Sequence, residues 1–117
     1  MSLRVKRIYE KFDKTDGYRI LVDRLWPRGL SKEKAKVDLW LKEIAPSNEL
    51  RKWYNHEHKK WDAFKNKYRE ELKGKEELLK QIKKLEKEFK TITLLFSSKE
   101  EKLNNAAALL EIIRKYD

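Results

Sequence analysis

Two short apolar segments place the strongest limit on how this chain can fold. Residues 18–24 have the continuous apolar centre Ile20-Leu21-Val22, and residues 91–97 combine β-branched and apolar side chains. Strands buried on both faces of a parallel sheet have this composition. We therefore expect two central strands, at 18–24 and 91–97.

Two further segments are candidate strands. Residues 3–9 alternate apolar and basic side chains with the period of two expected of a half-buried strand. Residues 38–44 alternate more weakly and also fit a helical turn. Only about nine residues, 9–17, join the first two strands, whereas a parallel crossover normally needs a dozen or more. The connection is therefore either an unusually compact crossover or an antiparallel hairpin that turns at Asp16-Gly17.

Helical patterns fill the remaining stretches. Ser31 is a candidate N-cap for a short helix through Lys36, and Ser47 is a candidate N-cap for the next helix. Longer helices are predicted over residues 58–73, 75–89 and about 99–116.

Two signals suggest where these longer helices end and begin. Gly74 suits the C′ position after the first of them. Ser98 and Glu101 have the spacing of a capping box at the start of the last one. Strands separated by helices favour an α/β fold, and 117 residues fit one domain. The expected architecture is a small, mainly parallel sheet of three to four strands flanked by helices, in a single compact domain over residues 1–117.

Composition excludes several classes of site. The chain has no cysteine, which rules out disulfides, thiolate metal sites and a cysteine nucleophile. Its two histidines, His56 and His58, are too few for a three-histidine zinc site, and no metal site is expected. No apolar run approaches the roughly 20 residues that span a bilayer, and the N-terminus lacks a signal-peptide core. We therefore expect no membrane partner and a cytoplasmic location.

The net charge of +10 has two interpretations. Lysine and glutamate enrichment is typical of proteins from hyperthermophiles, where charged residues form surface ion pairs. On that view the charge reflects a solvated surface. The alternative is a nucleic-acid partner, for which the basic residues of the first strand, Arg4, Lys6 and Arg7, are candidates.

The loop at residues 23–29, Asp-Arg-Leu-Trp-Pro-Arg-Gly, is the best candidate for a functional surface. Ligands of parallel α/β sheets bind outside the carboxyl ends of the strands, where this loop begins. Arg24 and Arg28 carry planar donors suited to carboxylates and phosphates, and Trp26 offers a stacking face. The alternative is structural: Asp23 pairs with one of these arginines, and Trp26 packs beneath a turn.

Three more segments contribute candidate site residues. Ser97, Ser98 and Lys99 follow the last strand, where free backbone N–H groups favour an anion, although a capping box explains the same residues. Asn104 and its neighbour Asn105 are poor helix formers, so at least one of the two side chains is expected to have a polar role.

His56 is the only candidate for general acid–base catalysis by its ordinary pKa, although a histidine at a helix end often serves the helix dipole instead. His58 lies in a lysine-rich run and looks like a surface residue. No glycine-rich phosphate loop or Walker-type lysine is present, so no cofactor is indicated.

Long motifs in this chain resemble one protein family. Residues 16–29, Asp-Gly-Tyr-Arg-Ile-Leu-Val-Asp-Arg-Leu-Trp-Pro-Arg-Gly, resemble the signature of the YeaO-like subgroup of the family called domain of unknown function 488. The similarity continues through 42–47 and 49–53 and ends with 93–99 and Asn104.

The resemblance implies a compact α/β fold and no established reaction. Family signature positions correspond to residues already identified above: Arg24, Trp26, Arg28, His56, Lys99 and Asn104. Members typically have Asn-His-Ala in the last helix, where this chain has Asn104-Asn105-Ala106. If that histidine performs acid–base chemistry, this chain lacks it; if it only donates a hydrogen bond, Asn105 can replace it.

Three functions are consistent with these residues. The first is a site for an anionic small molecule (a phosphate, nucleotide or carboxylate) formed by Arg24, Trp26, Arg28, Ser97, Lys99 and Asn104, with His56 as the candidate catalytic group. The second is a nucleic-acid-binding module that uses the basic surface. The third is a structural or partner-binding protein without a ligand site.

Overall fold

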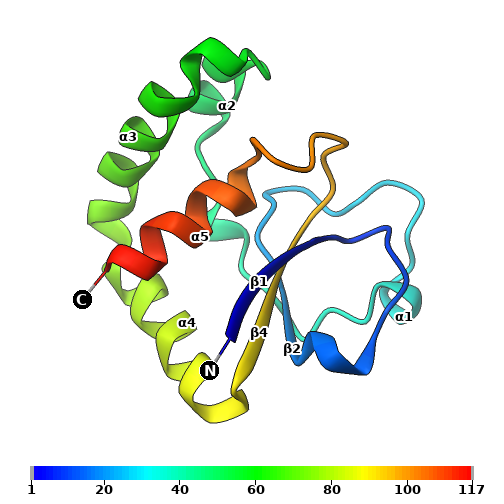
Figure 1. The fold of residues 1–117 in the computed structure, drawn as a ribbon. Helices are drawn as coiled ribbons and strands as arrows, with labels where there is room; N and C mark the ends of the chain where they lie inside the picture. The colour runs from blue at the N-terminus through cyan, green and yellow to red at the C-terminus, as the bar shows by residue number, and fades with distance from the viewer. Residues whose placement is uncertain (1, 117) are drawn as a thin grey trace.

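A four-stranded, all-parallel sheet forms the centre of the molecule in the computed structural model, which describes residues 2–116. The strands are β1 (Ser2–Arg7), β2 (Tyr18–Leu21), β3 (Leu39–Trp40) and β4 (Thr91–Phe96), and they lie in the order β1-β4-β2-β3 (Figure 1). The two segments with continuous apolar centres become the two inner strands, as predicted. The predicted α/β class and mainly parallel sheet are confirmed.

The weakest predicted strand divides into two elements. Leu39–Trp40 pairs with β2 as the short edge strand β3, and Lys42–Ile44 then forms a 3-10 turn, η2. Both interpretations of residues 38–44 therefore hold for part of the segment.

The connection between β1 and β2 is the unusually compact crossover, the first of the two alternatives left open by the sequence. The two strands are parallel and do not pair, because β4 lies between them, so there is no hairpin at Asp16-Gly17. The chain crosses the sheet through the 3-10 turn η1 (Lys14–Asp16) without an α-helix. The short connection alone could not decide between the two alternatives, because the partner of both strands comes more than 70 residues later in the sequence.

A buried ionic network fastens this crossover beneath the sheet. The Asp16 carboxylate accepts hydrogen bonds from Lys6, at 2.9 Å, and from Arg19. The backbone carbonyl of Asp16 accepts the hydroxyl of Thr93 at 2.6 Å. Burial opposes the charge on Asp16, but the hydrogen bonds from Lys6 and from the backbone of Asp13 outweigh it and lower the pKa of this carboxyl.

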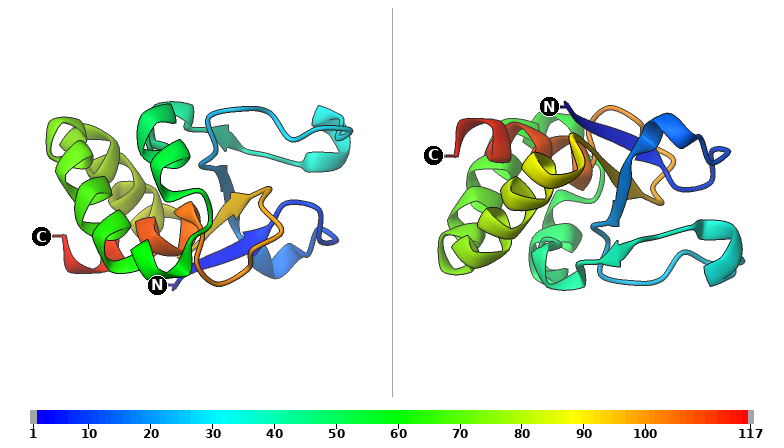
Figure 2. Two further views of the ribbon diagram at one scale, coloured as in Figure 1. Left: turned by 90° about the horizontal axis from the view of Figure 1, so that it is seen from above. Right: turned by 90° about the horizontal axis from the view of Figure 1, so that it is seen from below.

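Helices cover the two faces of the sheet unequally (Figure 2). One face carries α2 (Asn48–Tyr54), α3 (Trp61–Leu72), α4 (Glu76–Phe89) and α5 (Asn105–Lys115). Their apolar faces pack on inward-facing strand residues, including Ile20, Ile92 and Leu94, to form the main core. The other face has a smaller cluster, in which Leu21 and Leu95 contact the four-residue helix α1 (Lys32–Ala35) through Ala35.

Several predicted helix ends are confirmed. The hydroxyl oxygens of Ser31 and Ser47 accept backbone N–H groups of α1 and α2, as N-caps do. Gly74 is not a left-handed C′ residue; it lies in the 3-10 turn η4 (Lys73–Lys75) that carries α3 directly into α4. A 3-10 turn also precedes α3, at His58–Lys60 (η3).

The last helix begins about six residues later than predicted. Asn104, not Ser98, is the N-cap of α5, because its side-chain oxygen accepts the N–H of Ala107 at 2.9 Å. The Ser98 hydroxyl instead accepts the N–H of Glu100 within a turn, at 3.1 Å. The expected capping box is therefore wrong, and residues 97–104 form an irregular loop at the carboxyl edge of the sheet.

The described residues form one compact body. The radius of gyration is 13.5 Å, close to the value of about 13.4 Å expected for a single domain of this length. Within residues 2–116, no helix combines the length and apolar character needed to span a bilayer.

Candidate functional site

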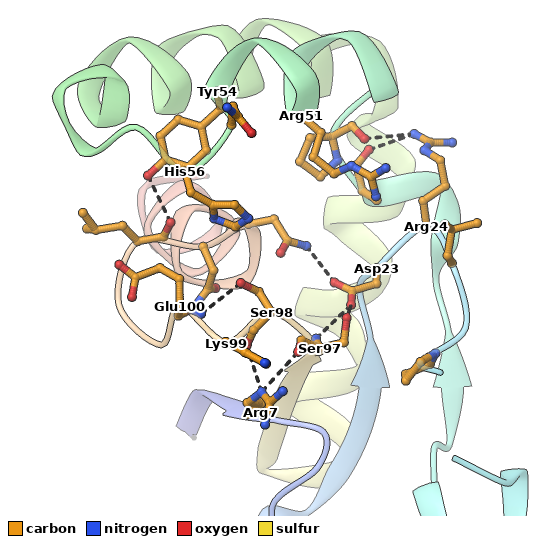
Figure 3. A pocket seen from close by; sticks show the side chains of 18 of the residues that line it. Arg7, Asp23, Arg24, Arg51, Tyr54, His56, Ser97, Ser98, Lys99 and Glu100 are labelled. Atoms are coloured by element: carbon orange, nitrogen blue, oxygen red, sulfur yellow. Dashed lines mark hydrogen bonds between the residues drawn. The ribbon is translucent and has the colours of Figure 1, made fainter. Parts of the chain in front are cut away.

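A pocket of about 860 Å³ opens at the carboxyl edge of the sheet (Figure 3). Its walls come from the loop after β2, the segment around α2, and the loop after β4. These segments meet because the strands are parallel, so their carboxyl ends share one edge.

All of the site residues proposed from the sequence line this pocket. They are Arg24, Trp26, Arg28, His56, Ser97, Lys99 and Asn104. The structure therefore brings together residues that lie up to 80 positions apart in the sequence. Their part in binding or chemistry stays a prediction.

Asp23 connects several segments that line the pocket. One carboxylate oxygen accepts the backbone N–H of Ser97 at 2.9 Å and its hydroxyl at 2.7 Å, and the other accepts the side-chain amide of Asn105 at 3.1 Å. The backbone carbonyl of Asp23 accepts the indole N–H of Trp40 at 2.8 Å. The alternative in which Asp23 pairs with Arg24 or Arg28 is therefore wrong: its carboxylate joins β2 to β4 and α5.

The two asparagines both have polar roles. Asn104 is buried, and its amide donates to the Glu100 carbonyl at 2.8 Å while its oxygen caps α5. Asn105 donates to Asp23 and to the Val22 carbonyl, at 3.1 and 3.2 Å. Position 105 therefore acts as a hydrogen-bond donor in this chain, which is the role in which an asparagine can replace a histidine.

Two arginines of the pocket are held by backbone carbonyls. Arg24 donates from Nη2 to Ala45 and, at 3.4 Å, to Pro46, while its buried Nε has no hydrogen-bond partner among the described residues. Arg7 donates from Nε to the carbonyls of Ser97 and Ser98, at 3.1 and 3.0 Å. Carbonyl dipoles orient these guanidinium groups but leave their charge uncompensated.

Four more cations line the pocket: Arg28, Arg51, Lys52 and Lys99. All four are exposed, and their side chains form no ion pair or hydrogen bond with other residues of the 2–116 range. Among residues 2–116, two carboxylates line the pocket, and both have partners: Asp23 as above, and Glu100, whose Oε1 lies 2.9 Å from Nε2 of His58. The lining therefore carries six arginine or lysine side chains against two occupied carboxylates, a clear excess of positive charge.

The pocket also has an apolar and aromatic side. Tyr54 is buried, stacks on Phe64 with ring centroids 4.4 Å apart, and donates its hydroxyl to Leu103 at 3.1 Å. Burial, with the nearby Glu100, raises the pKa of Tyr54. Trp26 packs edge-on against Trp40 and donates its indole N–H to Leu30, so its packing beneath the turn is observed even though it also lines the pocket.

His56 lies on the α2 side of the pocket, across from Ser98 and Lys99 (Figure 3). It follows Asn55, and both residues have left-handed backbone, with φ of 55° and 42° respectively. The ring centroid of His56 is 6.2 Å from that of Tyr54. Among residues 2–116 no carboxylate pairs with His56, so nothing observed there fixes its tautomer for acid–base work.

Three pocket cations were not among the predicted site residues. Arg7 ends β1, so the same strand-end reasoning would have found it had the strand been predicted to end there rather than at residue 9. Arg51 and Lys52 lie on α2, one turn beyond Ser47, and no local motif marks them. Within the described chain, no group of three or more potential metal ligands comes together.

The fold and the pocket define a small α/β protein with a basic cavity at the carboxyl edge of a parallel sheet. The chain belongs to the family DUF488-N3i, described as the inactive DUF488-N3 subclade, whose model matches residues 2–116. The resemblance to the domain of unknown function 488 is thereby confirmed.

The relatives of this chain have no described function. It is 41% identical over 114 residues to the uncharacterised protein YeaO of Escherichia coli, covering 97% of this chain and 98% of YeaO. It is 50% identical over 70 residues to uncharacterised proteins of Mycobacterium tuberculosis and Mycobacterium bovis. That alignment covers 60% of this chain and spans 59% of the length of each mycobacterial relative. No solved structure gave a significant match.

Proposed function

We propose that this protein binds an anionic small organic molecule, of the phosphate, nucleotide or carboxylate type, in the pocket at the carboxyl edge of its sheet. The observation that carries the proposal is the excess of positive charge: six arginine and lysine side chains line the cavity against the two carboxylates of Asp23 and Glu100. An anion supplies the missing counter-charge, and charge-assisted hydrogen bonds to arginine are among the stronger ones in proteins.

The size and lining of the pocket favour a ligand with an organic body. Small-molecule sites are typically clefts of about 300–1,000 Å³ with apolar walls and a few placed polar groups. The pocket, at about 860 Å³, lies within this range and is lined by Tyr54, Phe64 and Leu103 as well as by the cations.

Binding without chemistry is the form of the proposal that the site supports best. The matched family is described as inactive. Asn105 occupies a position where a histidine is typical, and its amide is committed to Asp23 and Val22. His56 remains the candidate acid–base group, but no carboxylate among the described residues orients it.

The nucleic-acid alternative is less well supported by the first strand. Lys6 pairs with Asp16, and Arg7 belongs to the pocket lining, so Arg4 is the one basic residue of this strand that remains for a separate nucleic-acid surface. We retain the cytoplasm as the proposed location of a chain with this composition.

A thermal-shift series tests the proposal. Inorganic phosphate, a nucleoside monophosphate and a dicarboxylate are each expected to raise the melting temperature of the wild-type protein, because ligands that bind only the folded state stabilise it. Arg28→Ala should diminish this rise because it removes one cation of the pocket, and the variant should fold because the exposed Arg28 side chain forms no hydrogen bond or ion pair among the described residues. The matched control is Arg4→Ala, an exposed arginine outside the pocket. The proposal fails if no anion raises the melting temperature of the wild type.

A further inference from the structure

Apart from Arg28 on the loop after β2, the cations of the pocket fall into two groups, one at each end. Arg24 and Arg51 lie at the end next to α2, whereas Arg7 and Lys99 lie at the end next to the loop after β4 (Figure 3). We call these the α2 end (Arg24, Arg51 and the adjacent Lys52) and the β4 end (Arg7 and Lys99). Each end combines one arginine held by backbone carbonyls with at least one exposed, uncompensated cation.

A carboxylate separates the two ends. Asp23 lies between them, held in place by Ser97 and Asn105 (Figure 3). A single anion placed midway would face this like charge at close range, which is unfavourable. An anionic group at either end instead meets cations and avoids Asp23.

The volume also exceeds what one small anion needs. A water molecule occupies about 30 Å³ in the liquid, and a free phosphate is only a few times larger. A cavity of about 860 Å³ leaves ample space for an organic body between two anionic groups. The side chains near the middle, including His56 and the aromatic ring of Tyr54, offer hydrogen-bonding and apolar contacts to such a body.

We propose that the ligand is a bis-anionic organic molecule, with one phosphate or carboxylate group at the α2 end and a second at the β4 end. This inference rests on the proposed anion-binding function and adds the number and placement of the anionic groups.

A matched pair of probes separates the two levels of the proposal. Fructose 1,6-bisphosphate and fructose 6-phosphate share one sugar and differ by one phosphate, and their affinities are measured by isothermal titration calorimetry at one fixed ionic strength. The bisphosphate should bind at least tenfold more tightly, since each charge-assisted contact is worth on the order of a factor of ten.

Two variants then assign the ends. Arg51→Ala and Lys99→Ala remove exposed side chains without hydrogen-bond partners among the described residues, so both proteins are expected to fold. Each variant should bind the bisphosphate on the order of tenfold more weakly, whereas at most one of them should lose that much affinity for the monophosphate. Arg4→Ala and Lys87→Ala, exposed cations outside the pocket, are the controls and should leave both affinities unchanged.

The outcomes are distinguishable. Equal affinity for the two probes overturns the bis-anionic inference. So does a result in which both variants lose as much affinity for the monophosphate as for the bisphosphate. Either result leaves simple anion binding standing. Failure of both probes to bind, together with failure of phosphate, the nucleoside monophosphate and the dicarboxylate in the thermal-shift series, overturns the inference and the proposed function.

Discussion

At the scale of single residues, Asp23 does most to assemble the pocket. Its carboxylate accepts three hydrogen bonds, from the N–H and hydroxyl of Ser97 and from the amide of Asn105. These bonds join the end of β2 to the end of β4 and the first turn of α5. A residue first considered as an ion-pair partner of its neighbours is therefore a link between elements more than 70 positions apart.

Replacing Asp23 should loosen that link. Asp23→Ala leaves two donors of Ser97 and one of Asn105 without their acceptor, and each lost hydrogen bond to a charged group costs about 1.5–3 kcal/mol. We expect the free energy of unfolding, measured in urea, to fall by at least about 2 kcal/mol. The control Glu88→Ala removes an exposed carboxylate from α4 and should change it by less than about 0.5 kcal/mol. Equal effects of the two substitutions would contradict this role for Asp23.

The three glycines provide a second test at this scale. Gly17 has φ of 68°, and an added Cβ would lie 2.3 Å from the carbonyl oxygen of Thr91, so Gly17→Ala should destabilise the protein by more than about 2 kcal/mol. Gly29 has φ of 77° but open space around it, so Gly29→Ala should cost about 1 kcal/mol. Gly74→Ala has neither strain nor a close neighbour and should be neutral or slightly stabilising. Chemical denaturation of the three variants measures the order of their stabilities. A Gly17 variant as stable as the Gly74 variant would refute the expected order.

Strand-end logic explains which site residues could be predicted from the sequence. Arg24 and Lys99 follow recognisable strands, so their shared location at one edge follows from a parallel sheet. Arg51 joins the pocket only because α2 packs over that edge, a tertiary arrangement that no local pattern encodes. Trp26 shows the opposite case: its aromatic ring was predicted as a stacking wall, and much of it is used in packing against Trp40.

At the scale of elements, the start of α5 shows how a local motif can mislead. Ser98 and Glu101 have the spacing of a capping box, but Arg7 binds the carbonyls of Ser97 and Ser98 and holds that segment as a loop. The helix begins only where Asn104 can cap it. The contact of Arg7, which is distant in sequence, therefore prevails over the local capping pattern.

The position of the cap can be measured. Asn104→Ala removes the N-cap of α5 and should lower the free energy of unfolding by about 1 kcal/mol or more, since the side chain is also buried. Ser98→Ala should cost less, because the hydroxyl that it removes accepts only one hydrogen bond, within a turn. If thermal denaturation shows Ser98→Ala to be the more damaging change, α5 begins at the earlier position.

The crossover from β1 to β2 was predicted least well among the elements. Its length was read correctly, but the strand that separates β1 from β2 could not be identified, because pairing between distant segments leaves no trace in either local pattern. What holds the short connection is the network of Asp16 with Lys6 and Arg19, which replaces the helix that usually covers such a crossover.

This network gives the stability a dependence on pH. The pKa of Asp16 in the folded protein is lowered, so its charge stabilises the fold fully above its usual pKa of about 3.9. That contribution is lost as the pH falls through the folded-state pKa. Asp16→Asn leaves Arg19 buried without its counter-charge and should cost about 3 kcal/mol at pH 7, with a smaller difference from wild type near pH 2. Urea denaturation at the two pH values measures both, and a difference that does not change with pH would contradict the assignment.

At the scale of the whole molecule, the distribution of charge matters more than its total. The net charge of +10 alone suits a solvated surface, a nucleic-acid partner or a small anion equally well. The structure adds which of these cations are paired with a carboxylate. Lys6 and Arg19 share the carboxylate of Asp16, whereas the cations around the pocket form no ion pair among the described residues.

The most direct test of this account is a two-dimensional ¹H–¹⁵N NMR titration of the wild-type protein with fructose 1,6-bisphosphate at physiological salt. We predict saturable shifts confined to the segments that form the pocket, at residues 7–9, 23–28, 45–46, 51–56 and 97–105. Salt screens weak, diffuse attraction between exposed charges, so a built site should keep its pattern as salt is raised. Shifts spread over basic residues throughout the surface, or no shifts at all, would contradict the claim that the pocket is a binding site for an organic anion.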